Sequence, residues 1–198
     1  MLEGKKVIVT GGGSGIGRAT CVLAAREGAE VAVADINPET GASTVEMVKA
    51  EGRDAILIEM DTPKKSDALR MAEETLKAFG TIDGLVCCAI KLVPGRLEEL
   101  PEEDWDMVID TGLKGYFLCA QAAGRVMLAK GSGSIVFVSS IGGVQAYNGA
   151  GAYSIAKAGN VMLGNLFGVE WGGRGVRANT VLPGQVHTPM TEAMFVDP

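Results

Sequence analysis

The sequence is dominated by a regular alternation of short apolar runs and longer amphipathic runs. The short runs indicate strands at residues 5–10, 30–35, 55–60, 82–88, 134–139 and 176–182. Helical patterns between them cover residues 16–27, 39–51, 64–79, 102–129 and 153–171. Strands that are apolar on both faces and joined by helices form parallel sheets covered on both sides. The sequence therefore predicts an α/β fold with a doubly wound parallel sheet, in a single domain over residues 1–198.

Composition argues against several other classes of protein. Hydrophobic residues make up 47% of the chain and charged residues 21%, which is a globular balance rather than a disordered one. Every apolar run is shorter than the roughly 18 residues of a membrane span, and the N-terminus lacks the features of a secretory signal. The net charge of −6 disfavours binding to nucleic acid or to an anionic membrane. We expect neither as a partner.

The cysteines and the single histidine argue against a metal site. Cys21, Cys87, Cys88 and Cys119 lie in apolar stretches and have no zinc-ligand spacing. His187 alone provides neither a metal cluster nor a Ser-His-Asp triad. Buried, reduced thiols are the simpler interpretation. We therefore expect no metal and a reducing, cytoplasmic location.

A glycine-rich turn follows the first predicted strand directly. The segment Thr-Gly-Gly-Gly-Ser-Gly-Ile-Gly at residues 10–17 lets backbone approach a pyrophosphate without Cβ clashes. The helix that follows offers unpaired N–H groups and the positive end of its dipole. A turn placed between a first strand and a first helix favours dinucleotide binding over a purely structural role. The candidate cofactor residues here are Gly11, Ser14, Gly15, Ile16 and Gly17.

Two acidic residues end the next two predicted strands. Asp35 lies near the spacing expected for a carboxylate that binds the adenosine ribose. Such a carboxylate accepts hydrogen bonds from both ribose hydroxyls and repels a 2′-phosphate, which favours NAD over NADP. Arg18 leaves some tolerance of NADP, and Asp35 alternatively only caps the turn after its strand. Asp61 is a candidate for the adenine amino group, with a surface cap as the alternative.

Three further residues form a candidate catalytic group. Tyr153 and Lys157 lie four residues apart at the start of a predicted helix, and therefore on one face. A tyrosine with an ordinary pKa near 10 needs a neighbouring cation to exchange protons near neutrality. Ser140 follows the fifth predicted strand, where open α/β sheets carry functional loops. A structural Tyr–Lys pair is the alternative when this spacing is taken alone.

Together these motifs closely resemble the short-chain dehydrogenase/reductase family, over essentially the whole chain. The matching positions are residues 10–17, Asp35, Asp61, Ser140, Tyr153, Lys157 and the run Pro-Gly-Gln-Val-His-Thr at 183–188. The separation of Ser140 from Tyr153 also matches, and selects Ser140 rather than Ser139 as the catalytic hydroxyl. The resemblance implies a Rossmann fold and an NAD-dependent oxidoreductase. Such an enzyme transfers a hydride between nicotinamide and a secondary alcohol or ketone.

The resemblance also implies a role for each residue. Tyr153 would be the general acid/base, Lys157 would lower its pKa and hold the nicotinamide ribose, and Ser140 would position the substrate oxygen. The residues expected to border the nicotinamide are Pro183, Gly184, Val186 and Thr188. The helices at 102–129 and 153–171 have surplus apolar surface, and members of the family usually pair these helices in dimers and tetramers. Together these points imply a homodimer or homotetramer.

Two positions depart from the family pattern. The family usually has Asn-Asn-Ala-Gly after the fourth strand, whereas residues 87–90 are Cys-Cys-Ala-Ile and retain only Ala89, a candidate cofactor contact. The family also usually has an asparagine in the long helix where this chain has Gly112. We expect Lys157 to be poorly held without that amide, unless a water or another polar neighbour replaces it.

The C-terminus and the retained chemistry leave other interpretations open. Relatives usually continue through a substrate-covering helix and a last edge strand. Residues 191–198 match the start of the substrate loop, so we expect the rest of that loop and the last strand to be missing. A non-catalytic dinucleotide sensor or scaffold is the main alternative function. An isomerase or epimerase on the same fold is a third.

Overall fold

The computed structural model describes residues 1–192 and residue 195, and a parallel sheet of six strands lies at its centre. The strands are β1 (Lys6–Thr10), β2 (Glu30–Asp35), β3 (Ala55–Glu59), β4 (Gly84–Cys87), β5 (Gly133–Val138) and β6 (Val176–Val181). Their order across the sheet is β3-β2-β1-β4-β5-β6, and each neighbouring pair is parallel. The predicted doubly wound parallel sheet is confirmed.

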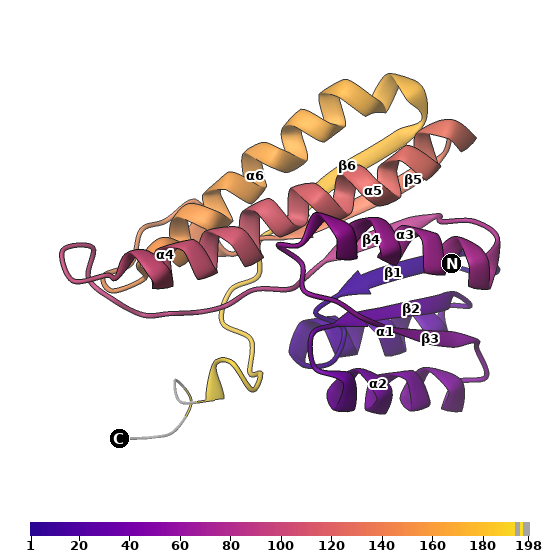
Figure 1. The fold of residues 1–198 in the computed structure, drawn as a ribbon, viewed down its shortest axis with the longest axis horizontal. Helices are drawn as coiled ribbons and strands as arrows, with labels where there is room; N and C mark the ends of the chain where they lie inside the picture. Colours follow the sequence, from indigo (N-terminus) through magenta and orange to yellow (C-terminus); the bar gives the residue numbers. More distant parts are fainter. Residues whose placement is uncertain (193–194, 196–198) are drawn as a thin grey trace.

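Helices cover both faces of the sheet (Figure 1). The helices α1 (Gly15–Arg26) and α2 (Pro38–Ala50) pack on one face. The helices α3 (Lys65–Phe79), α5 (Gly115–Lys130) and α6 (Ala152–Trp171) pack on the other. The helix α4 (Glu102–Ile109) extends beyond the sheet beside α6, and short 3₁₀ turns occupy Ile141–Gly143 and Gly172–Arg174.

Alternating side chains of the strands fill two separate cores. Ile8, Leu85 and Ile135 point toward α3, α5 and α6, whereas Val9 and Val33 point toward α1 and α2; all five are fully buried. Burial of one such side chain stabilises the fold by about 1.5–3 kcal/mol. Strands buried from both sides explain why the short runs are apolar throughout.

The strand order reverses between β1 and β4, which brings the ends of these two strands together. Thr10 is paired with Cys87 in the register, and the Cys88 amide donates a 3.1 Å hydrogen bond to the Thr10 hydroxyl. Chain segments leave this point in opposite directions across the sheet. Ligands of open α/β sheets bind at such a reversal, outside the carboxyl ends of the strands.

The long helical run predicted over 102–129 is confirmed, and the structure adds a π-helical turn within it. A π-helical turn, η1 (Asp110–Lys114), separates α4 from α5. The Gly112 carbonyl within this turn accepts a 2.9 Å hydrogen bond from the Asn160 side-chain amide on α6. A carbonyl bonded from outside its helix accompanies the wider turn, and glycine weakens the regular helix at the same point.

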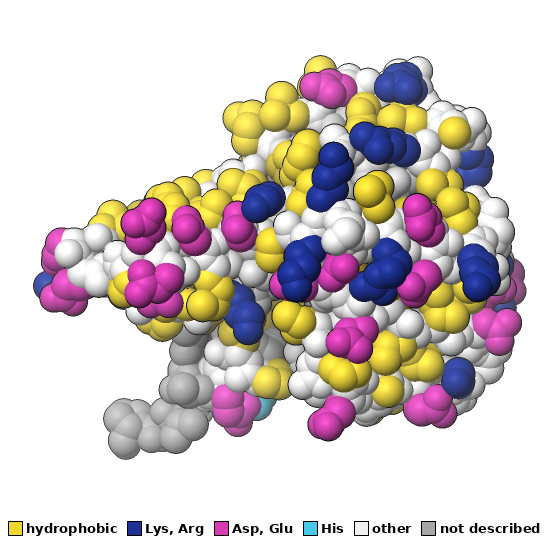
Figure 2. All heavy atoms as spheres, viewed as in Figure 1, with side chains coloured by type: hydrophobic (Ala, Val, Ile, Leu, Met, Phe, Trp, Pro, Cys, Tyr) yellow, Lys and Arg dark blue, Asp and Glu magenta, His cyan; other side chains and the backbone are white. Residues whose placement is uncertain are grey.

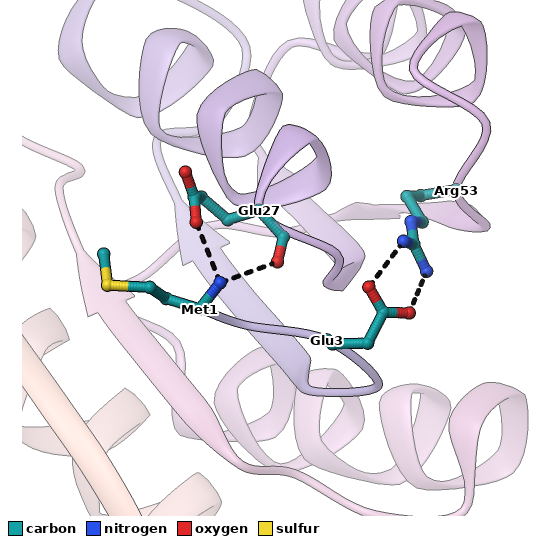
Figure 3. A network of polar contacts seen from close by, with 4 residues as sticks. All are labelled: Met1, Glu3, Glu27 and Arg53. Carbon is teal, nitrogen blue, oxygen red and sulfur yellow. Dashed lines mark hydrogen bonds and ion pairs between the residues drawn. The ribbon is translucent and has the colours of Figure 1, made fainter.

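Surface contacts hold the segment that precedes β1 (Figure 3). The Met1 ammonium donates a 2.9 Å hydrogen bond to the Glu27 carboxylate, just beyond α1. The Arg53 guanidinium, just before β3, donates two 2.8 Å hydrogen bonds to Glu3 and lowers the pKa of that carboxyl group. The segment is therefore joined to the end of α1 and to the start of β3.

None of the helices within residues 1–192 combines the length and the hydropathy needed to cross a membrane. Of the substrate loop expected at 191–198, residues 193, 194 and 196–198 lie outside the described residues.

Candidate functional site

A groove of about 290 Å³ crosses the carboxyl ends of the strands at the reversal point. Every residue selected from the sequence as a site residue lines this groove: Gly11, Ser14, Gly15, Ile16, Gly17, Asp35, Asp61, Ala89, Ser140, Tyr153, Lys157, Pro183, Gly184, Val186 and Thr188. They come from the carboxyl ends of all six strands or from the segments that follow them. The fold therefore brings the whole candidate set into one place.

The glycine turn is shaped by close backbone approaches. Gly11 has a φ of 66°, and a Cβ there would lie 2.8 Å from the Ala89 Cα across the reversal point. A Cβ on Gly17 would lie 2.7 Å from the Gly11 carbonyl carbon, so α1 can start directly against the turn only with glycine there. Ser14 precedes α1 without a side-chain capping bond, which leaves the first N–H groups of α1 facing the groove.

Asp35 both lines the groove and fixes the turn. Its carboxylate accepts a 2.8 Å hydrogen bond from the Gly13 amide and a 2.9 Å hydrogen bond from the Asn37 amide. Asp35 therefore does cap the turn after its strand, which was the alternative to ribose binding. Each carboxylate oxygen also keeps a lone pair for a further donor. Arg18 donates to Thr44 Oγ1 at 3.0 Å and to the Gly13 carbonyl, so its guanidinium supports the turn.

Asp61 lies at the same end of the groove, just beyond β3. Its side chain is 31% exposed and forms an ion pair of 3.3 Å with Lys64. Its backbone amide donates a 2.9 Å hydrogen bond to Asp67 at the start of α3. The carboxylate therefore faces solvent and groove together, and its expected contact with adenine stays a prediction.

The segment at 183–188 contributes four residues to the lining of the groove. The Pro183 carbonyl accepts a 3.0 Å hydrogen bond from the Ile141 amide, which joins the segment to the loop after β5. A Cβ on Gly15 would lie 3.4 Å from Thr188, so Thr188 stands over the glycine turn. Val186, 39% exposed, lies on the groove wall.

The two consecutive serines after β5 have different surroundings. The Ser139 hydroxyl is buried and donates a 2.6 Å hydrogen bond to the Lys157 carbonyl, which ties β5 to α6. The Ser140 hydroxyl accepts a 3.0 Å hydrogen bond from the Gly142 amide and interacts with Tyr153. The Ser139 hydroxyl is therefore used within the fold, and the catalytic role expected of Ser140 stays a prediction.

Tyr153 lies at the start of α6 with its pKa raised above the ordinary value. Burial causes the increase, and the interaction with the Ser140 hydroxyl opposes it. The ammonium nitrogen of Lys157 lies 5.6 Å from the centroid of the Tyr153 ring and donates its hydrogen bonds elsewhere. These contacts therefore do not show Lys157 lowering the pKa of Tyr153, and that effect stays a prediction.

Lys157 is deeply buried, with 2% of its surface exposed. Its Nζ donates a 2.7 Å hydrogen bond to the Val138 carbonyl and a 3.4 Å hydrogen bond to the Tyr116 hydroxyl. Burial lowers the pKa of Lys157 to about 8. The expectation of a poorly held lysine is wrong, because the alternative of another polar neighbour is realised by these two oxygens.

Tyr116 is a buried contact of Lys157 that the sequence analysis missed, and it is not among the residues that line the groove. It occurs in an apolar stretch of α5 and is fully buried, where it stacks on Phe137 at 6.2 Å between centroids. A buried tyrosine hydroxyl needs a polar partner. A tyrosine within an apolar stretch of a helix therefore indicates a buried polar contact. The partner is the Val138 carbonyl, which accepts a 3.2 Å hydrogen bond from Tyr116.

The two departures from the family pattern meet in space. A Cβ built on Gly112 would overlap the end of the Ile90 side chain, and would lie 3.6 Å from the Ala156 Cβ. The isoleucine therefore fills the volume beside Gly112 that an asparagine side chain would need. The two substitutions act as one exchange of a polar group for an apolar one.

The described part of the chain contains no group of three or more His, Cys, Asp or Glu side chains arranged to hold a metal ion. Its four cysteines are unpaired, and Cys21, Cys87 and Cys119 are buried. Burial raises the pKa of the Cys21 thiol to about 12 and that of the Cys88 thiol to about 11.

Comparisons with known proteins agree with this geometry. The family model described as short chain dehydrogenase matches residues 5–197. The chain is 37% identical to a 3-oxoacyl-acyl-carrier-protein reductase of Thermotoga maritima, over 98% of its own length and 78% of the relative.

Solved structures are similar over the same extent. A levodione reductase superposes with a TM-score of 0.94 at 30% identity, covering 98% of this chain and 76% of the other. A carveol dehydrogenase of Mycobacterium avium, solved in complex with NAD, gives a TM-score of 0.93 at 31% identity, covering 96% of this chain and 74% of the other.

Proposed function

The chain belongs to the short-chain dehydrogenase family, and on this premise we propose that it is an NAD-dependent oxidoreductase acting on secondary alcohols and ketones. One observation carries the proposal: Ser140, Tyr153 and Lys157 line the same groove as the glycine turn and Asp35. A group that transfers protons is thereby adjacent to a place suited to a dinucleotide. Proximity of this kind is what a hydride transfer with proton exchange requires.

The groove fits a nicotinamide dinucleotide. The backbone around Gly11 and Gly17 leaves no room for side chains, and the start of α1 presents unpaired N–H groups to a pyrophosphate. Asp35 keeps acceptor lone pairs for ribose hydroxyls, and its negative charge opposes a 2′-phosphate. We therefore propose NAD rather than NADP, because Arg18 is engaged with the turn.

A bound nicotinamide supplies the hydride donor or acceptor at this site. The residues of the chain handle the oxygen and its proton. Ser140 holds the substrate oxygen beside Tyr153, and Tyr153 gives a proton to that oxygen during ketone reduction or takes it during alcohol oxidation. The pKa of Tyr153 is raised, so its phenol carries at neutral pH the proton that ketone reduction needs, although the raised pKa makes it a weaker acid.

A non-catalytic nucleotide sensor is a second candidate, favoured by the raised pKa of Tyr153 and by the apolar Ile90–Gly112 contact. The test is oxidation of NADH and of NADPH, followed at 340 nm, with a panel of ketones. Mass spectrometry of the nucleotide that copurifies accompanies it. Ketone-dependent oxidation of NADH supports the oxidoreductase, nucleotide binding without turnover supports the sensor, and conversion of substrate without net oxidation supports an isomerase or epimerase.

We also propose that two copies of the chain associate through α6. Met162, Leu166 and Val169 on this helix are 58%, 51% and 84% exposed. Hydrophobic side chains gather along the upper rim of the molecule, over α6 (Figure 2). An apolar stripe of this kind on a helix indicates a protein interface, which makes a homodimer or homotetramer the proposed assembly.

The proposed location is the cytoplasm. Its support is the set of unpaired cysteines, since buried free thiols are typical of proteins from a reducing compartment.

A further inference from the structure

The buried ammonium of Lys157 has an unusual set of partners. Within the described residues it forms no ion pair with a carboxylate, and its hydrogen-bond acceptors are the Val138 carbonyl and the Tyr116 hydroxyl. The titratable groups that face it are Tyr153 on its own helix, Tyr116 on α5, and Cys87 and Cys88 at the end of β4. Both cysteines have raised pKa values, so they bring no negative charge at neutral pH.

Tyr116 meets this ammonium in two ways. Its ring centroid lies 5.4 Å from Lys157 Nζ, within the range of a cation–π interaction. Its oxygen accepts from Lys157 at 3.4 Å while its own proton is donated to the Val138 carbonyl at 3.2 Å. The three polar atoms thus form a closed set, and the Val138 carbonyl accepts from both side chains. Burial raises the pKa of Tyr116 far above its ordinary value, so this phenol stays a donor and takes no part in proton exchange.

We propose that Tyr116 is a positioning residue that holds the charged form of Lys157. This inference rests on the proposed function of the site. It assigns to α5 a hydroxyl and a ring that favour the ammonium where Gly112 and Ile90 bring only apolar surface. The stacking of Tyr116 on Phe137 fixes the ring that performs this task.

The first test measures the pKa of Lys157 directly, by NMR of lysine labelled with ¹³C at Cε and assigned with Lys157→Arg. Tyr116→Phe keeps the ring and removes the oxygen, so the pKa of Lys157 should fall by about one unit, since a hydrogen bond to the charged form raises a lysine pKa. Tyr116→Leu also removes the ring and should lower the pKa further. Tyr147→Phe is the matched control, because Tyr147 is exposed and its hydroxyl bonds to Gln145 rather than to Lys157. An unchanged lysine pKa in folded Tyr116→Phe overturns the proposal.

The second test follows NADH binding and ketone reduction against pH. If the pKa falls from about 8 to about one unit lower, the loss in Tyr116→Phe should be slight at pH 6 and about fivefold at pH 8. A loss of equal size at every pH would indicate a merely structural role and would contradict the proposal. If the wild type reduces no ketone, the proposed function fails while the lysine titration still decides the role of Tyr116.

Discussion

Replacing Gly112 by asparagine tests whether Ile90 and Gly112 form one packing unit. A Cβ at position 112 would overlap the terminal methyl of Ile90, although it would lie 3.5 Å from the next carbon of that side chain. Alanine therefore requires a rotation of the isoleucine end alone. Asparagine adds three further heavy atoms to a site that is buried at Gly112.

These contacts set the expected magnitudes. An off-rotamer isoleucine costs about 0.5–1.5 kcal/mol, whereas replacing glycine in a helix contributes about 1 kcal/mol. Gly112→Ala should therefore change the free energy of unfolding by less than about 1 kcal/mol. Overpacking by asparagine costs about 1–3 kcal/mol, so Gly112→Asn should be destabilising by about 1–2 kcal/mol. Gly112→Asn alone is consequently not expected to raise turnover.

The assay is a double-mutant cycle measured by urea denaturation. In the Ile90→Ala background the asparagine has room, so its destabilisation should disappear and the coupling energy should be about 1–2 kcal/mol. The doubly substituted protein is also the variant expected to show increased turnover at neutral pH. Effects that add to within about 0.5 kcal/mol would refute the packing unit, since independent sites behave in that way.

Four further outcomes are expected. Tyr153→Phe should reduce turnover by about two to four orders of magnitude with little change in NADH affinity, measured by steady-state kinetics and fluorescence; unchanged turnover would exclude the proposed acid. Asp35→Ala should weaken NAD at least about tenfold in calorimetry, because it removes two charge-assisted hydrogen bonds, while NADP should weaken less; a wild type that prefers NADP would contradict this role. Lys157→Met should stabilise the fold by roughly 1–3 kcal/mol at pH 7, because a lysine whose pKa is lowered to about 8 destabilises the fold below that pH. The destabilisation is relieved as the pH rises from about 8 toward the unfolded value, so the two proteins should have similar thermal stability near pH 10. Leu166→Asp combined with Val169→Asp should reduce the light-scattering mass to the 20.5 kDa of one chain, and an unchanged mass would remove α6 as the interface.

The sequence predicted the sheet because its strands are buried on both faces and its turns are marked by glycine. It also predicted which residues gather at the groove, since Asp35, Ser140 and the segment at 183–188 all follow strands whose ends meet. It could not predict the π-helical turn within the long helix, where the Asn160 side chain bonds to the Gly112 carbonyl across 48 positions of sequence. Local propensity contains no information about a contact of that kind.

The partners of Lys157 were beyond the sequence for a similar reason. The side chain of Tyr116 resembles any aromatic core residue until its distance from Lys157 is known. The contact between Ile90 and Gly112 likewise joins two residues that seemed to be separate departures. In both cases the decisive information is the distance between elements, and no periodicity along a single element carries it.

The two hydrogen bonds that Asp35 accepts link cofactor choice to the folding of the cofactor site. The carboxylate accepts hydrogen bonds from the Gly13 and Asn37 amides, so contacts within the chain itself fix the turn. A nucleotide therefore meets a rigid site and loses little affinity to the ordering of the loop. The same arrangement makes position 35 a poor place for a one-step exchange of NAD for NADP, because losing the carboxylate also releases the turn. A lineage that changed its cofactor would more easily begin at Ile36, which is 56% exposed beside the same groove and holds no part of the turn.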